Sequence, residues 1–538
     1  MKTLFNLAVF SMIFVSLCAH SSPNIIFIVT DDQGWTSVSY PSDPFRSDSA
    51  SDYFETPNMA TLAAEGMRFT QAYTPNPICA PARHAILFGQ RTTRHKYNRD
   101  ETWIDRAPDW LTIPKALKAA NPEYRTAHFG KWHVGVKPGL AGFDFSDGLT
   151  DNEEGDRAAG RVFADTNFVD QGTTDAYNEA HGIDTTPVNA KGRDRAVPFY
   201  LSDDPKTAFS LTARASAFIR EAVTDGKPFY AHIAHYAVHS AFSARPESFA
   251  KFQDKKPGSR HDDAAFAAML FDLDAAIGQV MDLVKELGIK DNTYIVVMSD
   301  NGGVAYYAQT SQIDADINIL STHRTRIPWN NAPLRDGKHS FYEGGLRVPF
   351  IFTGPDIAAN SHSDQPITGL DLLPTFARLA GYEGAFDAPL DGESLVPLID
   401  DSDKTVFERK DPTLIFHQAG RRPARSAVRE GRYKLVKFWT QSSESGGEKL
   451  PYTLELYDLE TDIGEQNDLS AGHPEIVADL HGKLLRHIAE TNSEFEDNPR
   501  SDPMGILLKR EGQGSSRKEQ LENREPVVVE YVSPYKSK

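Results

Sequence analysis

The chain has 538 residues, a length that suits about three domains or, equally, one large domain and a smaller one, and its 75 acidic and 57 basic side chains give a net charge of −18. This balance argues against non-specific nucleic-acid binding, which needs a basic surface, and it means that an anionic ligand must be met by a local cluster of cations. Contents of 37 glycines and 33 prolines are ordinary and exclude collagenous and low-complexity classes.

The first 21 residues have the pattern of a signal peptide. Lys2 gives a positive start, residues 4–17 are apolar, and Ala19 and Ser21 place small residues at a cleavable spacing. The apolar run is about 14 residues, shorter than the ~20 that cross a bilayer, so no transmembrane segment is expected. The prediction is an exported protein, periplasmic or secreted.

Two alternatives to a cleaved signal peptide are a buried N-terminal helix and a lipid anchor through Cys18. Cleavage would leave Cys79 as the single cysteine, and a lone cysteine forms no internal disulfide. That thiol is either an incidental buried cysteine or one that is kept for chemistry.

Strand and helix patterns alternate through the first two thirds of the chain. Residues 24–29 form a continuous β-branched apolar run that predicts a strand buried on both faces. Residues 294–298 have the same pattern, and residues 262–287 carry apolar side chains at helical spacing. Further helices are expected from Thr56 to Met67 and over residues 111–119. The alternation predicts an α/β fold with a large, mainly parallel sheet sandwiched by helices.

The remaining segments predict a loop-rich insertion and a second, smaller unit. Residues 144–198 are polar and weakly periodic, which is typical of a long insertion. Beyond residue 380 the pattern changes to an antiparallel sheet and one helix, followed by a charged tail over 510–538. The expected strands are 413–416, 427–429, 433–438 and 455–458, and the expected helix is 474–490. The predicted domains are therefore 22–380 and 381–538.

Oxygen-bearing side chains follow two of the predicted strands. Asp31 and Asp32 come after the first strand, and Asp300 and Asn301 come after the strand at 294–298. Ligands bind at the carboxyl ends of strands in such sheets, and hard oxygen donors suit Ca²⁺ or Mg²⁺. The alternative interpretation is that these residues make turns or cap helices.

Cationic and nucleophilic residues occur near other strand ends. Cys79 precedes Pro81, which is comfortable in the first turn of a helix, so Cys79 is expected at a helix N-terminus with Arg83 one turn on. Two strand-like runs end in basic residues: Lys131 and His133 follow 124–129, and His235 and His239 follow 228–234. Lys338 lies in a later loop. Together these residues describe an anion site with a general acid and a general base. The alternative for each is a solvated surface group.

Five blocks of this sequence, in this order, resemble the type I sulfatases, the formylglycine-dependent sulfate ester hydrolases of the alkaline-phosphatase superfamily. The blocks are 24–34, 79–83 with the pattern C-x-P-x-R, 130–133, 299–302 and 337–345. Residues 455–469 are similar to the C-terminal subdomain of the same family. The resemblance implies an alkaline-phosphatase-like catalytic domain over 22–380 and a C-terminal subdomain over 381–538.

The resemblance also implies a cofactor set and roles for the site residues. Cys79 would be oxidised to formylglycine (3-oxoalanine) by a formylglycine-generating or sulfatase-maturating enzyme, and its hydrate would attack sulfur and later expel sulfate. Ca²⁺, in preference to Mg²⁺, would be held by the four oxygen donors Asp31, Asp32, Asp300 and Asn301. Arg83 and Lys131 would steady the nucleophile, His133 would be the base for elimination, and His239 and Lys338 would bind sulfate and protonate the leaving oxygen. The segment around His239 lacks the two prolines that are frequent there in the family, so His235 is a rival for that role.

The predicted substrate is a sulfated polysaccharide or its oligosaccharides, as for exported bacterial polysaccharide sulfatases. A phosphatase or phosphonate monoester hydrolase of the same superfamily is the first alternative, and a binding protein that keeps the fold without activity is the second. Candidate substrate-binding residues lie on loops near the motifs, where the alternative is a solvated surface group: Arg94, His95, His323, Arg324, Arg326, Trp329 and Arg335.

Overall fold

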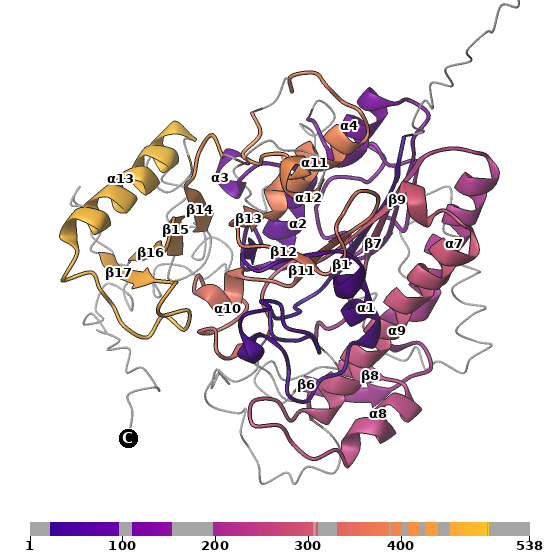
Figure 1. Ribbon diagram of the computed structural model, residues 1–538, viewed down its shortest axis with the longest axis horizontal. Coiled ribbons are helices and arrows are strands. Elements are labelled where there is room, and N and C mark those ends of the chain that lie inside the picture. The colour runs from indigo at the N-terminus through magenta and orange to yellow at the C-terminus, as the bar shows by residue number, and fades with distance from the viewer. Residues whose placement is uncertain are drawn as a thin grey trace, which may run out of the picture.

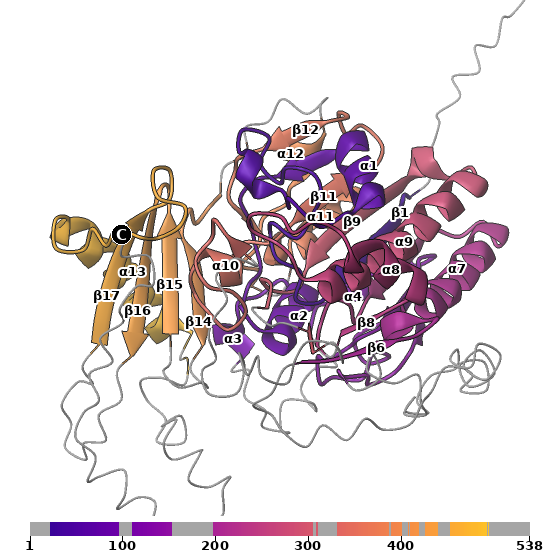
Figure 2. The same cartoon turned by 90° about the horizontal axis from the view of Figure 1, so that it is seen from below.

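A computed structural model describes two bodies of structure that lie side by side (Figures 1 and 2). The described residues are 22–95, 110–152, 197–240, 242–304, 308–309, 331–386, 389–400, 407, 409–418, 425–439, 452–491 and 493. The predicted signal peptide, most of the predicted insertion and the charged tail lie outside them. The side chains of 95, 197–200, 308–309 and 439 are also outside the description.

The larger body is built on an eight-stranded sheet with the order β12-β2-β11-β9-β1-β7-β4-β5. The central strand β1 pairs in parallel with β7 and β9, and β4 pairs in parallel with β7 and β5. β11 runs antiparallel to both β9 and β2. The predicted mainly parallel sheet is confirmed. The strand bounds are β1 Asn24–Thr30, β2 Met67–Phe69, β4 Arg125–Gly130, β5 Phe145–Ser146, β7 Phe229–Ala234, β9 Thr293–Ser299, β11 Phe350–Thr353 and β12 Ser361–Ser363.

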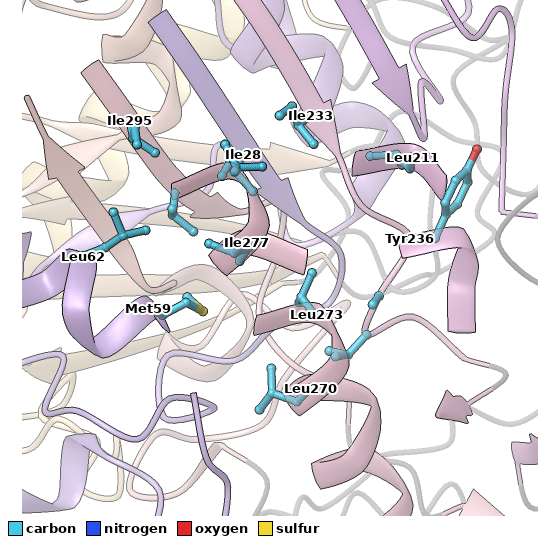
Figure 3. Packing of buried hydrophobic residues seen from close by; sticks show 14 of the residues in the cluster. Ile28, Met59, Leu62, Leu211, Ile233, Tyr236, Leu270, Leu273, Ile277 and Ile295 are labelled. Carbon is cyan, nitrogen blue, oxygen red and sulfur yellow. The ribbon is translucent and has the colours of Figure 1, made fainter. Parts of the chain in front are cut away.

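Helices cover both faces of this sheet, and β1 shows why. Ile26 and Ile28 pack into the layer that contains α1, α7, α8 and α9, whereas Ile25, Phe27 and Val29 pack into the layer that contains α2, α4 and α11. Figure 3 shows Ile28 next to Ile277 in the first of these layers. Successive side chains of a strand point to opposite faces, so a continuous apolar run is buried on both. The helix bounds are α1 Pro57–Glu65, α2 Cys79–Phe88, α3 Thr92–His95, α4 Ile113–Ala120, α7 Ala208–Thr224, α8 Pro246–Gln253, α9 Ala264–Glu286, α10 Glu343–Leu346, α11 Leu372–Leu379 and α12 Val396–Ile399.

The long helix α9 agrees with the helical periodicity of residues 262–287. Its start is set by Asp263, whose side chain accepts hydrogen bonds from the backbone amides of Ala265 and Phe266. Among the described residues, α9 is the one helix long and apolar enough to cross a membrane. Most of its side chains are instead buried against the sheet and its neighbouring helices, as expected of a core helix.

The second body is a four-stranded antiparallel sheet in the order β14-β15-β16-β17, with the helix α13 (Pro474–Glu490) on one face. Leu480, Leu484 and Ile488 of α13 pack against that face. The opposite face contacts the larger body through a cluster that includes Tyr73 and Leu346. The predicted sheet and helix are thus confirmed, with strands at Leu414–Gln418, Arg425–Glu430, Tyr433–Trp439 and Tyr452–Asp458.

The structure differs from the sequence-based expectation in two places near the main sheet. The helix expected from Thr56 to Met67 ends at Glu65, and Met67 begins β2 after the extended Gly66. The segment read as an insertion from residue 144 begins inside the main sheet, because β5 pairs with β4. Strands of two to four residues carry too short a pattern to be recognised from sequence.

Five short strands form two small sheets apart from the main sheet. β6 (Val197–Leu201) joins β8 (Phe242–Ala244) and β10 (Ala308–Gln309) in a small sheet, and β3 (Ala72–Tyr73) pairs with β13 (Ile367–Thr368).

Candidate active site

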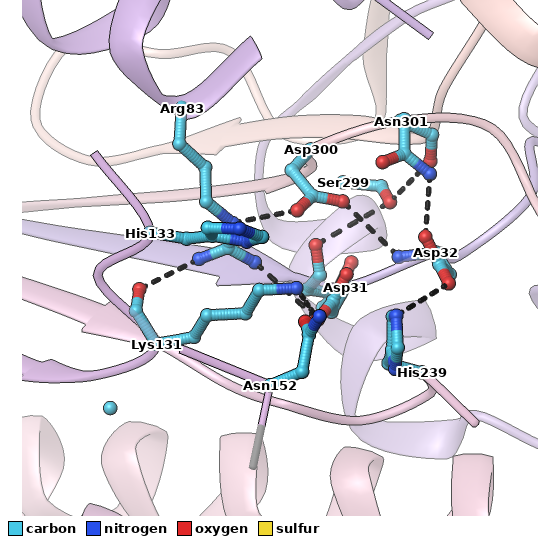
Figure 4. A network of polar contacts seen from close by, with 12 residues as sticks. Asp31, Asp32, Arg83, Lys131, His133, Asn152, His239, Ser299, Asp300 and Asn301 are labelled. Carbon is cyan, nitrogen blue, oxygen red and sulfur yellow. Dashed lines mark hydrogen bonds and ion pairs between the residues drawn. The ribbon is translucent and has the colours of Figure 1, made fainter. Parts of the chain in front are cut away.

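The carboxyl ends of β1 and β9 bring four oxygen-bearing side chains together (Figure 4). The two strands pair in register up to Thr30 and Ser299, so the residues that follow each strand meet at one edge of the sheet. The backbone amide of Asp300 donates to the carbonyl of Thr30 at 3.0 Å, which ties the two turns together. Asp31, Asp32, Asp300 and Asn301 are all fully buried there.

Cys79 is the first residue of α2 and lies beside these carboxylates. Its sulfur and one carboxylate oxygen each of Asp31 and Asp300 lie within 4.8 Å of one another. One turn further along α2, the Nε of Arg83 donates to Asp300 Oδ2 at 2.7 Å, and its Nη1 donates to the carbonyl of Lys131 at 2.9 Å. The expected placement of Cys79 at a helix N-terminus, with Arg83 reaching into the same site, is what the structure has.

Two lysines reach the same carboxylates from other loops. Lys131 Nζ donates to Asp31 Oδ2 at 2.5 Å, and Lys338 Nζ donates to Asp32 Oδ2 at 2.7 Å. Burial alone would lower the pKa of each lysine, but the neighbouring carboxylates raise it, so both ammonium groups stay charged. With Arg83, they give three cations against three carboxylates. A local cluster of cations therefore exists in a strongly acidic protein.

The two histidines expected in the site are both present at it. His239 Nε2 lies 3.8 Å from Asp32 Oδ2, and His133 Nε2 lies 3.5 Å from Asp151 Oδ1. Burial and then the Lys338 charge lower the pKa of His239 well below its usual value. Burial and then Lys131 lower the pKa of His133 to about 3. Both imidazoles are therefore neutral at neutral pH.

His235, the rival of His239, is placed differently. It is fully buried, and burial alone lowers its pKa to about 3. Among the described residues, neither of its ring nitrogens has a hydrogen-bond partner. Because His239 contacts Asp32 and feels the site's charges while His235 does not, the geometry favours His239.

The oxygen donors fit a divalent cation. Asp31 Oδ1 and Asn301 Oδ1 are buried without a hydrogen-bond partner in the described part of the chain. Burial raises the pKa of Asp300 to about 6 in spite of the Arg83 guanidinium, and it also raises the pKa of Asp32. Clustered buried carboxylates of this kind are stabilised by a cation, and an all-oxygen set suits Ca²⁺ or Mg²⁺ better than a softer metal.

Several residues near the site had no sequence signal that singled them out. Thr74 donates its hydroxyl to the carbonyl of Asp300. The Thr150 hydroxyl accepts from the backbone amide of Trp132 at 2.9 Å, and Asp151 contacts His133. Thr150 and Asp151 lie in the segment interpreted as an insertion, where no motif marks them.

Arg94 and Arg335 are the two candidate substrate-binding residues whose side chains are among the described residues. Arg94 is held by Asp391 through two hydrogen bonds of 2.7 Å each. Arg335 is buried and donates to the hydroxyl of Tyr457 at 2.9 Å and to the carbonyl of Glu465 at 2.8 Å, so it serves the contact between the two bodies instead of a solvated loop. The side chain of His95 and all of His323, Arg324, Arg326 and Trp329 lie outside the described residues.

Comparison of the chain with known proteins finds sulfatase family models and proteins named as sulfatases. A family model described as "Sulfatase" matches residues 23–382, and one described as "N-sulphoglucosamine sulphohydrolase, C-terminal" matches residues 336–490. A protein named "Sulfatase" from Formosa agariphila is 28% identical over 540 residues, covering 88% of this chain and 90% of its own. The N-acetylgalactosamine-6-sulfatase of Canis lupus familiaris is 29% identical over 448 residues, covering 78% of this chain and 73% of its own.

Solved structures share the fold. Ps i-CgsB in complex with k-i-k-neocarrahexaose aligns with a TM-score of 0.63 and 24% identity, covering 94% of this chain and 100% of that chain. The phosphonate monoester hydrolase of Agrobacterium radiobacter aligns with a TM-score of 0.58 and 18% identity, covering 88% and 97%. Proteins named for different reactions thus have this architecture, so the reaction has to be argued from the site and the family.

Proposed function

Because this chain belongs to the sulfatase family and is a sulfuric ester hydrolase, we propose that it removes sulfate from sulfated carbohydrates. The proposal includes conversion of Cys79 to formylglycine and binding of one Ca²⁺ ion. The observation that carries it is the position of Cys79, whose sulfur lies within 4.8 Å of carboxylate oxygens of Asp31 and Asp300 at the N-terminus of α2. A modified residue at this point would act beside a bound cation.

The charges of the site support recognition of a sulfate ester. Three carboxylates are balanced by Arg83, Lys131 and Lys338, so a divalent cation would leave an excess of two positive charges among these buried side chains at the sheet edge. When bound, Ca²⁺ would attract the sulfate oxygens and formylglycine would provide the attacking hydroxyl. Fixed positive charges in a water-poor site stabilise developing negative charge strongly.

Proton transfer is assigned to three side chains of this chain. Lys338 keeps its proton because the Asp32 carboxylate raises its pKa, so it can donate to the oxygen of the departing alcohol, with His239 next to it. His133 is neutral at neutral pH because burial lowers its pKa, so it can accept a proton when sulfate leaves. The contact with Asp151 orients its ring.

The carbohydrate substrate is supported by named relatives. One relative at 29% identity is an N-acetylgalactosamine-6-sulfatase, and a protein of the same fold was solved with a neocarrahexaose. The signal-peptide pattern of residues 1–21 fits an enzyme that meets polysaccharide outside the cytoplasm. We extend the proposal to export and to modification of Cys79 by a formylglycine-generating or sulfatase-maturating enzyme.

The test is a substrate panel with protein produced together with a maturation enzyme. We expect sulfate release from 4-nitrophenyl sulfate and from at least one defined sulfated oligosaccharide, and loss of turnover in EGTA that added Ca²⁺ restores. Faster hydrolysis of 4-nitrophenyl phosphate or of a phenylphosphonate ester than of any sulfate would contradict the proposal and favour the phosphonate hydrolase alternative.

A further inference from the structure

The four-residue helix α10 (Glu343–Leu346) contacts two of the loops that form the site. The carbonyl of Gly345 accepts a hydrogen bond of 3.0 Å from the backbone amide of Gly302, which directly follows Asn301. The carbonyl of Leu346 accepts one of 2.8 Å from the amide of Thr74, in the segment that leads to Cys79. The position of α10 therefore affects both the oxygen donors and the nucleophile.

A third contact joins α10 to the loop of Lys338. The amide of Gly344 donates to the carbonyl of Arg335 at 2.9 Å, and the amide of Lys338 donates to the carbonyl of Gly303 at 2.9 Å. A helix of one turn has little stability of its own, because helix nucleation is unfavourable. Something outside α10 has to hold it in place.

The anchor of α10 is a buried charge network at Glu343. The Glu343 carboxylate accepts hydrogen bonds of 2.8 Å each from the hydroxyl of Tyr73, Nε of Arg347 and Nζ of Lys434. The backbone amide of Glu343 donates to Glu465 Oε2 at 2.6 Å, and Glu465 Oε1 lies 2.9 Å from Lys434 Nζ. Glu343, Lys434 and Glu465 are fully buried.

Two residues of the C-terminal body contact Glu343 directly, and a third, Arg429 of β15, donates to the Tyr73 hydroxyl of the same network. Lys434 is on β16, and Glu465 lies seven positions beyond the end of β17, at the contact between the sheet and the larger body. Each is buried beside charges of opposite sign, so removing one partner alone would leave an uncompensated buried charge. The network thus connects the C-terminal sheet to α10 and, through α10, to three site loops.

We propose that Lys434 and Glu465 are positioning residues of the active site, through which the C-terminal body holds α10 and with it the Asp300–Asn301 pair. They touch neither substrate nor cation. The inference rests on the proposed function only in that a cation occupies the oxygen donors. Partners that orient metal ligands in this indirect way typically change metal affinity or activity 10–100-fold when removed.

The experiment compares a charge-neutral double variant with a matched control. Lys434→Met/Glu465→Gln removes one charge of each sign and keeps an amide oxygen that can accept from the Glu343 amide. Lys483→Met/Glu430→Gln removes the ion pair of 2.6 Å between α13 and β15, on the face of the sheet opposite the one that contacts the larger body. We expect the first variant to remain folded by circular dichroism, to bind Ca²⁺ about 10–100-fold more weakly by calorimetry and to lose kcat in similar proportion. The control should stay within twofold of the wild type in both quantities.

A measurement on the wild type covers the case in which the double variant does not fold. Coupling between two sites is reciprocal, so Ca²⁺ binding should slow hydrogen–deuterium exchange in α10 and in the segment around Glu465, but not around Lys483. Unchanged Ca²⁺ affinity in a folded double variant, or unchanged exchange in α10 on adding Ca²⁺, would overturn the inference. Failure of the wild type to hydrolyse any sulfate ester would instead count against the proposed function.

Discussion

Gly302 offers a sharp test of how tightly the site is held. A methyl group at this position would clash most closely with the carbonyl oxygen of Gly344 and would lie 2.8 Å from the carbonyl carbon of Gly344 and 2.8 Å from the Cα of Gly345, all backbone atoms of α10. Carbon atoms pack at about 3.5–4.0 Å, so Gly302→Ala requires the turn after Asn301 or α10 to move by at least about 1 Å. A displacement of about 1 Å of groups that hold reacting atoms costs on the order of 100-fold in rate.

The assay for Gly302→Ala is kcat/KM on 4-nitrophenyl sulfate together with the Ca²⁺ dissociation constant. We expect both to worsen, with kcat/KM down by about 100-fold, while circular dichroism shows a folded protein. Gly139→Ala is the matched control, because a methyl group there meets no atom within 4 Å. If Gly302→Ala keeps kcat/KM and Ca²⁺ affinity within threefold of the wild type, the loops are more adaptable than their packing indicates and the reasoning is wrong.

The other predictions concern Cys79, two histidines of the site and one remote histidine. Cys79→Ala should be inactive, and mass spectrometry of the wild-type peptide should show formylglycine; full activity from unmodified cysteine would contradict this. His239→Ala should slow alkyl sulfates about 10²–10⁴-fold and activated aryl sulfates less, because His239 lies beside Lys338, the donor to the leaving oxygen, and a good leaving group needs less protonation. His133→Ala should slow both alike. The same leaving-group dependence in both variants would refute this division of roles. Burial and then Arg91 lower the pKa of His487 to about 4, below its ordinary 6.5. As the pH falls, the His487 imidazole is therefore protonated in the unfolded state before it is protonated in the folded state. The free energy of unfolding should fall by about 3 kcal/mol between pH 6.5 and 4. Urea titrations across that range should show a shallower loss in His487→Gln, and an equal loss would exclude this histidine as the cause.

The amino-acid sequence alone was enough to predict the layered α/β architecture and to bring most of the candidate site residues to one edge of the sheet. The run at 24–29 is apolar at every position, and in the structure β1 is buried on both faces for that reason. Asp31 and Asp300 could be placed together because both follow such strands, and parallel strands end at the same edge of a sheet. Such local patterns can be read from the sequence because each buried position of a strand or helix requires an apolar residue, whatever lies elsewhere in the chain.

Only the tertiary structure shows which side chains from distant segments of the chain contact one another. His235 and His239 are alike in sequence, and only the folded chain shows that His239 faces Asp32. The link from Lys434 to Glu343 spans 91 positions and two bodies of structure. No periodicity or motif records such a link, because a buried ion pair depends on which surfaces meet and not on the spacing of residues along the chain.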